Sequence, residues 1–212
     1  MNFAIIAQQL VSGMGSSLMI FVLTLLFSMP LGLLVAFGRM SKIKPLQAVI
    51  KVFIAILRGT PLMLQLLVVN FAPYYLFRIS LPRWYRFAAI IIGFSINYAA
   101  YFAEIYRSGI ESIPKGQYEA ASVLGYNKNQ TFFRIIFPQM VKRVLPPVTN
   151  EVITLVKDTS LAFVLAYEEM FTVAKQIASA RTSIMPLFVA GVFYFIFNGV
   201  VAFAMERIEK KL

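Results

Sequence analysis

Two ionisable residues, Lys157 and Asp158, stand side by side within a mostly apolar stretch of the sequence. On membrane-insertion scales such a residue costs roughly 2.5–3.5 kcal/mol at the centre of a bilayer, and it usually faces a polar cavity. The pair is therefore a candidate for binding a polar ligand. The Asp158 carboxylate can accept hydrogen bonds from an ammonium group, whereas hydroxyl and amide groups can donate to a carboxylate. An ordinary ion pair between helices is the alternative role.

Further polar residues in or beside apolar stretches are candidates for the same pathway. Thr60 precedes Pro61, which breaks a helix, and such a break is tolerated within a membrane where the freed backbone lines a cavity. Arg58 can instead extend its charged end to the membrane surface. Asn97 can instead form an interhelical hydrogen bond worth about 0.6 kcal/mol. The candidate pathway residues are Asp158, Lys157, Thr159, Ser160, Asn97, Thr60, Gln65 and Arg58.

Other polar or aromatic residues in these stretches favour structural roles. Tyr98 and Tyr101 are expected to pack against neighbouring helices or lipid. Glu104 and Arg107 are three residues apart, so we expect a local ion pair on one helix. Glu151 is expected to have a similar local structural role near the start of its apolar stretch.

The residue types that most enzymes need are missing from the sequence. It has no Cys and no His, which excludes thiol catalysis, disulfides and His-based metal sites or proton relays. Asp158 is the only Asp, so a pair of intramembrane aspartates is excluded. There is also no Gly-x-Ser-x-Gly nucleophile motif. We therefore expect no catalytic site and no bound metal.

The composition predicts an all-α integral membrane protein. Of the 212 residues, 59% are hydrophobic and 14% are charged, whereas soluble domains have about 25% charged residues. Runs of about 20 mostly apolar residues, the length that crosses a bilayer as a helix, recur along the chain. We expect one membrane domain, residues 1–212, with five transmembrane helices. The expected spans are about 18–38, 52–77, 87–105, 145–166 and 186–205.

The net charge of +11 arises from 20 Lys and Arg residues. They cluster at the ends of apolar stretches, which indicates membrane topology rather than nucleic-acid binding. With a cytoplasmic C-terminus, thirteen basic residues lie inside, five lie outside and two lie within spans. Because cytoplasmic loops carry an excess of Lys and Arg, we expect the N-terminus outside and the C-terminus inside. Arg78, Arg83 and Arg86 oppose this assignment.

A polar loop, residues 112–138, separates the third and fourth apolar stretches. Pro114 suits the first turn of a short helix, and Gly125 suits the left-handed position just past its end. Between them, Ala120 and Ala121 are strong helix formers with little bulk, which permits close approach to a partner. A plain interfacial amphipathic hairpin is the alternative interpretation.

This loop resembles the EAA loop of ABC-importer permeases. The family pattern is Glu-Ala-Ala, three residues, Gly, nine residues and Ile-x-Leu-Pro. The sequence matches it from Glu119 to Pro138, except that Phe137 stands where Leu is usual. The resemblance implies a type I ABC-importer architecture in which the loop is a cytoplasmic coupling helix. The implied ATPase-contacting residues are Glu119, Ala120, Ala121 and Gly125.

The same resemblance implies several partners. They are two cytoplasmic ABC ATPase subunits, a second permease subunit that is identical or similar, an extracytoplasmic binding protein and membrane lipid. The implied location is a bacterial-type cytoplasmic (inner) membrane. The chain has no Walker A motif, because Gly32 and Gly38 are one residue too far apart and Arg39-Met40 follows them. ATP and Mg are therefore expected on the partner ATPase, with no cofactor on this chain.

Three further stretches are similar to permeases for polar amino acids within this superfamily: Arg58–Leu62, Asn97–Glu104 and Leu155–Leu161. The resemblance implies a polar amino acid as substrate, carried by alternating access. Asp158 would bind its ammonium group, while Thr159, Ser160 and Asn97 offer hydrogen-bonding partners. The alternative is a stand-alone secondary carrier or channel for small polar solutes. Such carriers often contain inverted repeats, and none is evident in the sequence.

Residues 168–180 lie between the last two apolar stretches and place apolar residues at helical spacing. The spacing predicts a short amphipathic helix on the outer surface. Its function is either contact with the binding protein or coverage of the helix bundle.

Overall fold

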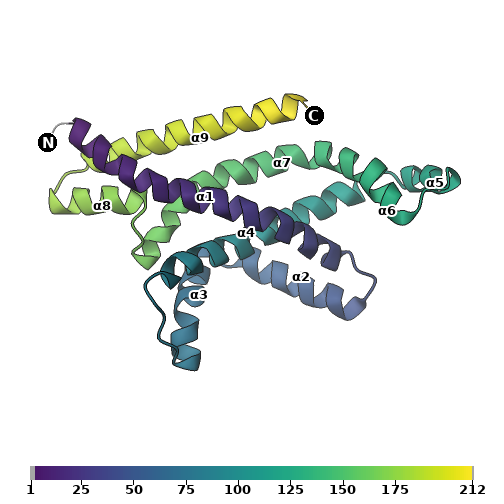
Figure 1. Ribbon diagram of the computed structural model, residues 1–212, viewed down its shortest axis with the longest axis horizontal. Coiled ribbons are helices and arrows are strands. Elements are labelled where there is room, and N and C mark those ends of the chain that lie inside the picture. Colours follow the sequence, from purple (N-terminus) through teal and green to yellow (C-terminus); the bar gives the residue numbers. More distant parts are fainter. Residues whose placement is uncertain (1–2, 212) are drawn as a thin grey trace.

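The computed structural model describes residues 3–211, and these residues form helices and connecting segments without a strand. Figure 1 shows the long helices side by side, with the short helices α5 and α6 at one end and α8 at the other. The elements are α1 Phe3–Arg39, α2 Lys44–Gly59, α3 Leu62–Phe77, α4 Tyr85–Glu111, α5 Lys115–Val123, α6 Lys128–Thr131, the π-helical turn η1 Phe132–Ile136, α7 Phe137–Asp158, the 3-10 helix η2 Thr159–Leu165, α8 Met170–Ala180 and α9 Met185–Lys211.

Helices α1 and α4 share the most extensive contact between any two elements of the described chain. The contact is close because small residues recur at every fourth position on one face of α1. A Cβ atom added at Gly32 would lie 2.8 Å from Cβ of Phe102 and 3.1 Å from the carbonyl oxygen of Ala99. Small residues allow helix backbones to approach in a membrane, where packing rather than water exclusion favours association. Four consecutive buried small residues at this spacing in α1 are Thr24, Ser28, Gly32 and Ala36.

The expected second span, 52–77, consists of two helices rather than one. The chain bends by 111° between α2 and α3, around Thr60 and Pro61. Helix α3 turns away from α2 (Figure 1) and packs on the first half of α4. Among residues 3–211, α1, α4 and α9 are long and apolar enough to cross a membrane, and the bent pair would make four. Helix α7 is not in this set because it carries five charged residues. A count of five spans is therefore not confirmed, although the all-helical fold is.

Helix α7 also differs in its limits from the expected fourth span, 145–166. It begins at Phe137, immediately after the π-helical turn, and continues through two internal prolines to Asp158. The last part of the expected span, from Thr159 to Leu165, is the 3-10 helix η2.

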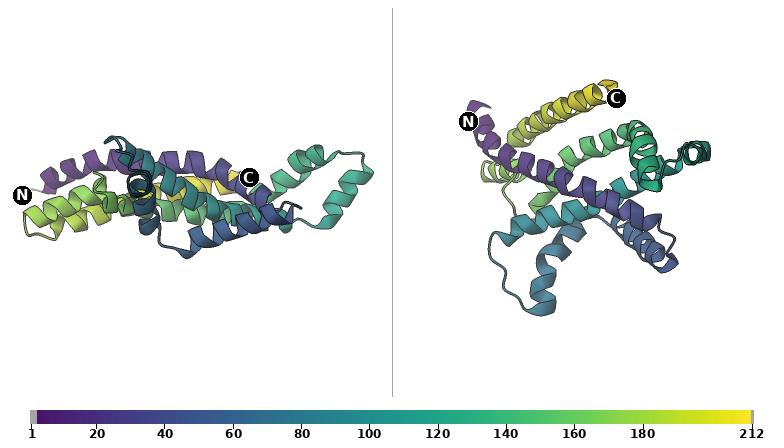
Figure 2. Two further views of the ribbon diagram at one scale, coloured as in Figure 1. Left: turned by 90° about the horizontal axis from the view of Figure 1, so that it is seen from below. Right: turned by 45° about the vertical axis from the view of Figure 1, so that its right-hand side comes forward.

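The expected amphipathic helix at 168–180 is α8, and a buried carboxylate fixes its start. Glu169 accepts hydrogen bonds from the N–H groups of Phe171 and Thr172, both at 2.7 Å. It also accepts from the Tyr194 hydroxyl of α9 at 3.1 Å and from the Ser17 hydroxyl of α1 at 3.4 Å. Burial raises the pKa of the Glu169 carboxyl, and the hydrogen bonds it accepts oppose this rise. Glu169 therefore links α8 to α1 and α9, which lie beside it in Figure 2.

Candidate functional site

A cavity of about 410 Å³ opens where the α2–α3 break, α4, α7 and η2 meet. It combines carboxylate, hydroxyl and amide groups with aromatic rings, so it can bind a small polar ligand. Three of the eight candidate pathway residues line it. The lining residues are Thr60, Pro61, Leu62, Asn97, Tyr98, Tyr101, Glu151, Thr154, Asp158 and Leu161.

Asp158, the last residue of α7, is held at this cavity by a tyrosine of α4. The Tyr98 hydroxyl donates to Oδ2 of Asp158 at 2.7 Å. Within residues 3–211 Lys157 forms no ion pair with Asp158, and its side chain is exposed. Tyr98 is almost completely buried and was expected only to pack. A buried Tyr usually needs a hydrogen-bond partner for its hydroxyl, and this rule could have pointed to Asp158.

Two side-chain amides replace the hydrogen bond that the α2–α3 break removes. The carbonyl of Leu57 would normally accept from the N–H four residues later, but that residue is Pro61, which has none. Instead, Nε2 of Gln65 donates to the Leu57 oxygen at 2.9 Å and Nδ2 of Asn97 donates to it at 3.1 Å. Asn97 also donates to Oε1 of Gln65 at 2.9 Å, and Gln65 donates to Oγ1 of Thr60 at 2.9 Å. The break is thus a fixed corner whose polar groups are paired.

The two hydroxyls that follow Asp158 in the sequence lie outside the set of lining residues. Thr159 donates to the carbonyl of Val156 at 2.8 Å, and Ser160 donates to that of Lys157 at 2.7 Å. Both hydroxyls therefore bind the backbone of their own helical turn. Their roles in a pathway stay predictions.

Helical spacing brings two residues to the cavity that the sequence interpretation did not assign to it. Glu151 and Thr154 line the cavity with Asp158, and intervals of three and four residues place all three on one face of α7. The same spacing could have been read from the sequence. Glu151 was instead expected to act as a local structural residue, so the cavity contains one more carboxylate than expected.

Arg58 lies next to an aromatic wall of the cavity. Its guanidinium carbon is 5.1 Å from the centroid of the Tyr101 ring, within the range of a cation–π interaction. The side chain is otherwise exposed. Tyr101, which was expected to pack, therefore connects the cavity to a positive charge.

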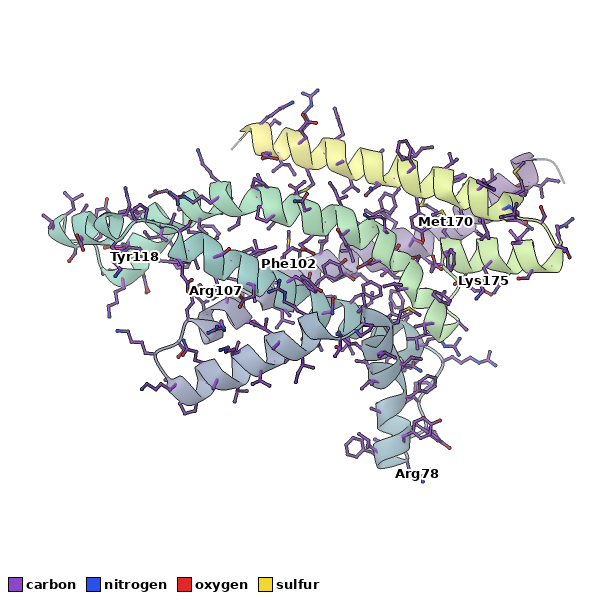
Figure 3. The ribbon with its side chains drawn as sticks, turned by 180° about the vertical axis from the view of Figure 1, so that it is seen from behind. Arg78, Phe102, Arg107, Tyr118, Met170 and Lys175 are labelled. Atoms are coloured by element: carbon purple, nitrogen blue, oxygen red, sulfur yellow. The ribbon has the colours of Figure 1, made fainter. Side chains whose placement is uncertain are left out.

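The polar loop forms a hairpin of α5, α6 and η1 that projects beyond the long helices (Figure 2). In Figure 3, Tyr118 of this hairpin lies at the opposite end of the molecule from Lys175 of α8. Helix α5 begins after Pro114 and ends before Gly125, whose φ is +79°. This confirms the left-handed conformation predicted for Gly125.

Local hydrogen bonds close both ends of the hairpin turn. The N–H of Tyr126 donates to the Ala121 carbonyl and that of Gly125 to the Ser122 carbonyl, both at 3.0 Å, which is the Schellman pattern of a helix C-terminus. Immediately afterwards, the side chain of Asn127 accepts from the N–H of Gln130 at 2.9 Å, and the reciprocal bond is 3.0 Å. This capping box starts α6.

Exposure divides the implied ATPase-contacting residues into two groups. Glu119, Ala120 and Gly125 are exposed, whereas Ala121 is only 1% exposed. Beyond them, Val123 and Leu124 are 88% and 72% exposed. The surface available to a partner is therefore more apolar than the four implied residues alone suggest.

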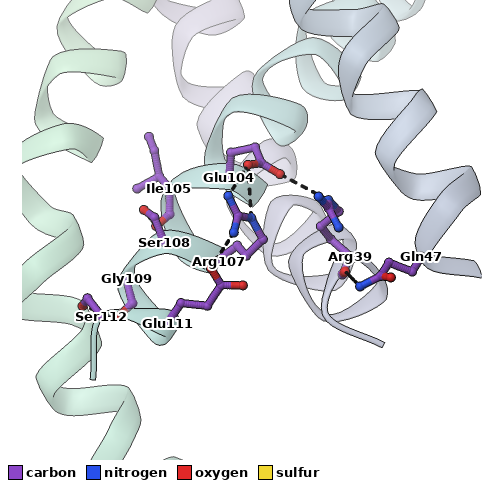
Figure 4. Close-up of polar contacts among 9 residues, drawn as sticks. All are labelled: Arg39, Gln47, Glu104, Ile105, Arg107, Ser108, Gly109, Glu111 and Ser112. Atoms are coloured by element: carbon purple, nitrogen blue, oxygen red, sulfur yellow. Dashed lines mark hydrogen bonds and ion pairs between the residues drawn. The ribbon is translucent and has the colours of Figure 1, made fainter. Parts of the chain in front are cut away.

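An ion cluster ties α1 to α4 at the hairpin end of the molecule (Figure 4). Arg107 contacts Glu104 at 2.8 Å, which confirms the predicted local pair, and it also pairs with Glu111. Nε of Arg39, the last residue of α1, lies 3.7 Å from Glu104. The contribution of Arg39 depends on helix packing and was not visible in sequence spacing.

Comparison with known proteins identifies the family. Residues 28–212 match the family model described as "Binding-protein-dependent transport system inner membrane component". The L-cystine transport system permease protein TcyB of Bacillus subtilis (strain 168) is 37% identical over 193 residues, which cover 90% of this chain and 81% of that protein. The putative glutamine transport system permease protein GlnP of Rickettsia felis (strain ATCC VR-1525 / URRWXCal2) is 34% identical, with 90% and 87% covered.

A solved structure agrees with these matches over the whole fold. A crystal structure of an amino acid ABC transporter with histidines has a TM-score of 0.88 to this chain at 29% identity, and it covers 100% of this chain and 99% of that chain. The resemblance drawn from the EAA loop is thus confirmed. The chain belongs to the family of binding-protein-dependent transport system inner membrane components, the permease subunits of ABC importers.

Proposed function

We propose that the chain is the membrane-spanning subunit of an ATP-driven importer of polar amino acids, and that it forms the translocation pathway by alternating access. The observation that carries the proposal is the cavity at Asp158, in a chain whose relatives are named as permeases for cystine and glutamine. Family membership also argues against a stand-alone carrier or channel, because this family works with a binding protein.

The cavity suits the charges of an amino acid. The Asp158 carboxylate accepts one hydrogen bond from Tyr98 and has further lone pairs for an ammonium group. Glu151 adds a second carboxylate on the same face of α7. Arg58, over the ring of Tyr101, supplies a guanidinium for the substrate carboxylate, a pairing that is often bidentate.

The hairpin at the other end of the chain is the proposed contact with the ATPase. Glu119, Ala120, Val123 and Leu124 form its exposed face, and this face would dock on a cytoplasmic ABC ATPase subunit. Two such subunits, a second permease subunit and an extracytoplasmic binding protein complete the proposed assembly. ATP and Mg would be bound by the ATPase subunits, so the chemistry of hydrolysis lies outside this chain.

The proposed orientation places the hairpin in the cytoplasm. In Figure 1 the N-terminus lies at the end farthest from the hairpin, and α9 runs from that end towards the hairpin end. This arrangement supports an outer N-terminus and a cytoplasmic C-terminus, in agreement with the distribution of basic residues. Helix α8 would then lie on the extracytoplasmic side, where a binding protein delivers substrate.

Native mass spectrometry of the detergent-extracted assembly tests this proposal. We expect two ATPase subunits and a second permease subunit to be retained, together with a small amino acid that is lost in an Asp158→Asn variant. Extraction of this chain alone, with no ATPase subunit under any detergent condition that preserves its fold, would contradict the proposal.

A further inference from the structure

An arginine of α7 is joined to the corner where α4 ends and the coupling helix α5 begins. Nη1 of Arg143 donates to the carbonyl oxygen of Ser112 at 2.6 Å and to its hydroxyl at 3.1 Å. Ser112 is the residue after the last turn of α4, and only Ile113 and Pro114 separate it from α5. The hydrogen bonds therefore reach across 31 residues of sequence to the first residue of this connection.

The position of the guanidinium is electrostatically favourable. The last carbonyl groups of a helix have no intrahelical partner and carry a partial negative charge. Arg143 binds such a carbonyl at the end of α4. Within residues 3–211 it forms no ion pair with a carboxylate. The guanidinium thus acts on the backbone of the corner itself.

Two neighbouring contacts make the junction close. A Cβ atom added at Gly109 would lie 2.1 Å from Cγ1 of Val144, so α4 and α7 touch directly one turn before Ser112; Figure 4 shows Gly109 and Ser112 together at this end of α4. One turn earlier on α7, Nε2 of Gln139 donates to Oε1 of Gln117 on α5 at 3.3 Å. Helix α7 therefore contacts both sides of the corner.

The two helices that meet at this corner also form the walls of the cavity. Helix α4 carries Asn97 and Tyr98, and α7 carries Glu151 and Asp158. Along α7, Asp158 is fifteen residues beyond Arg143, about 22 Å at 1.5 Å per residue. A displacement of α5 would therefore have to reach both α4 and α7 to move both walls, and the Arg143–Ser112 hydrogen bonds join these two helices at the corner.

We propose that Arg143 is a positioning residue that fastens α7 to the α4–α5 corner, so that movement of the coupling helix reaches both walls of the cavity together. This inference rests on the proposed function. It predicts that loss of the guanidinium separates ATP hydrolysis from transport, rather than only weakening the fold.

The test uses the complete complex in lipid vesicles and measures the number of ATP molecules hydrolysed per amino acid taken up. Labelled cystine, glutamine and histidine serve as probes. Arg143→Ala should raise this ratio about 2- to 30-fold, the range seen for residues that carry coupling. Arg143→Lys should restore part of the coupling, since it keeps the charge but not the planar donor fork.

Two controls separate this role from simple helix capping. Lys142→Ala removes an exposed positive charge from the adjacent position and should leave the ratio unchanged. Ser112→Ala removes the longer hydrogen bond but keeps the carbonyl acceptor, so its ratio should stay near that of the unsubstituted chain. An Arg143→Ala complex that assembles poorly, but whose assembled fraction has a normal ratio, would overturn the inference and leave Arg143 as a structural cap.

Failure of the proposed function would look different. If the unsubstituted complex takes up none of the three probes in an ATP-dependent manner, the proposed function is contradicted and the inference falls with it. If the unsubstituted complex transports normally and Arg143→Ala has the same ratio, only the inference is wrong.

Discussion

The cavity and the hairpin both contain an interruption of helical structure, but different parts of the chain repair them. At the α2–α3 break, the carbonyl of Leu57 is satisfied by side chains of Gln65 and Asn97, and Asn97 comes from another helix 40 residues away. At the hairpin, Gly125 and Asn127 close the turn through bonds to residues within five positions. The cavity therefore depends on tertiary packing, whereas the hairpin depends on local sequence.

This difference suits the proposed roles of the two regions, which are ligand binding at the cavity and contact with another subunit at the hairpin. A binding cavity gains from polar groups held rigidly by several helices, because preorganised groups need less ordering when a ligand binds. A hairpin that contacts another subunit can keep its shape with few contacts to the rest of its own chain. Variants at Asp158 and Gln65 should therefore damage the cavity, whereas variants at Gly125 and Leu124 should act on the hairpin alone.

The largest expected effect concerns the carboxylate of the cavity. Asp158→Asn should lower the initial rate of amino-acid uptake about 10- to 150-fold, because a hydrogen bond to a charged group contributes about 1.5–3 kcal/mol. Uptake of labelled substrate into vesicles containing the whole complex measures this rate. Lys157→Gln is the matched control, since Lys157 is the exposed neighbour. Normal uptake by Asp158→Asn would make Asp158 a structural residue.

The second largest effect is expected on the free energy of unfolding, at the α2–α3 break. Gln65→Ala should lower the free energy of unfolding by about 1–3 kcal/mol, because it removes donors from Leu57 and Thr60 and leaves their acceptors poorly satisfied. Gln117→Ala, which removes one long, exposed hydrogen bond between the hairpin and Gln139 of α7, should stay within about 0.5 kcal/mol. Denaturant unfolding in detergent compares the two. If both variants lost the same free energy of unfolding, the α2–α3 break would depend on side-chain hydrogen bonds no more than the hairpin does.

A smaller effect is expected at the hairpin turn. Gly125→Ala should destabilise the hairpin by about 1–2 kcal/mol, since its φ of +79° disfavours any Cβ atom. Gly116 has no positive φ and open space around it, so Gly116→Ala should leave the hairpin unchanged or slightly more stable. Hydrogen exchange of the hairpin amides reports the difference. If the hairpin amides of Gly125→Ala exchanged as slowly as those of the unsubstituted chain, the assignment of strain to this position would be contradicted.

The smallest effect concerns the exposed apolar face. Leu124→Ser should weaken binding of the purified ATPase subunit by about 1 kcal/mol, roughly fivefold, without a measurable change in unfolding. Surface substitutions of this kind usually change stability by less than about 0.5 kcal/mol. A titration monitored by light scattering or calorimetry measures the affinity. Unchanged affinity would place the ATPase contact elsewhere on the hairpin.

The distinction between contacts within a short segment and contacts between distant helices also explains what the sequence could predict. The helical membrane fold, the short helix of the hairpin, the left-handed Gly125 and the Glu104–Arg107 pair all follow from composition or from residues close in sequence. The cavity was found only in part. Asp158, Asn97 and Thr60 line it, but Thr159 and Ser160 donate to carbonyls three residues earlier on their own backbone, as Ser and Thr hydroxyls often do in helices.

The residues that sequence reasoning missed are joined to their partners over long separations. Tyr98 and Asp158 are 60 positions apart, and Glu169 and Ser17 are 152 positions apart. No spacing rule links such pairs, whereas Glu151 and Thr154 could have been found from the helical period that ends at Asp158. The count of five spans is not confirmed for a different reason, since α7 carries five charged residues and α2 and α3 form a bent pair rather than one straight helix.

ATP-driven accumulation is the most direct test of the central claim, that the cavity carries an amino acid while the hairpin connects it to hydrolysis on another subunit. Vesicles containing the complete complex, loaded with Mg and either ATP or ADP on the hairpin side, are supplied with binding protein and labelled amino acid. We predict that the amino acid moves to the hairpin side and rises above its starting concentration only with ATP. Equal movement with ADP, stopping at equal concentrations on both sides, would contradict the account and favour a passive carrier.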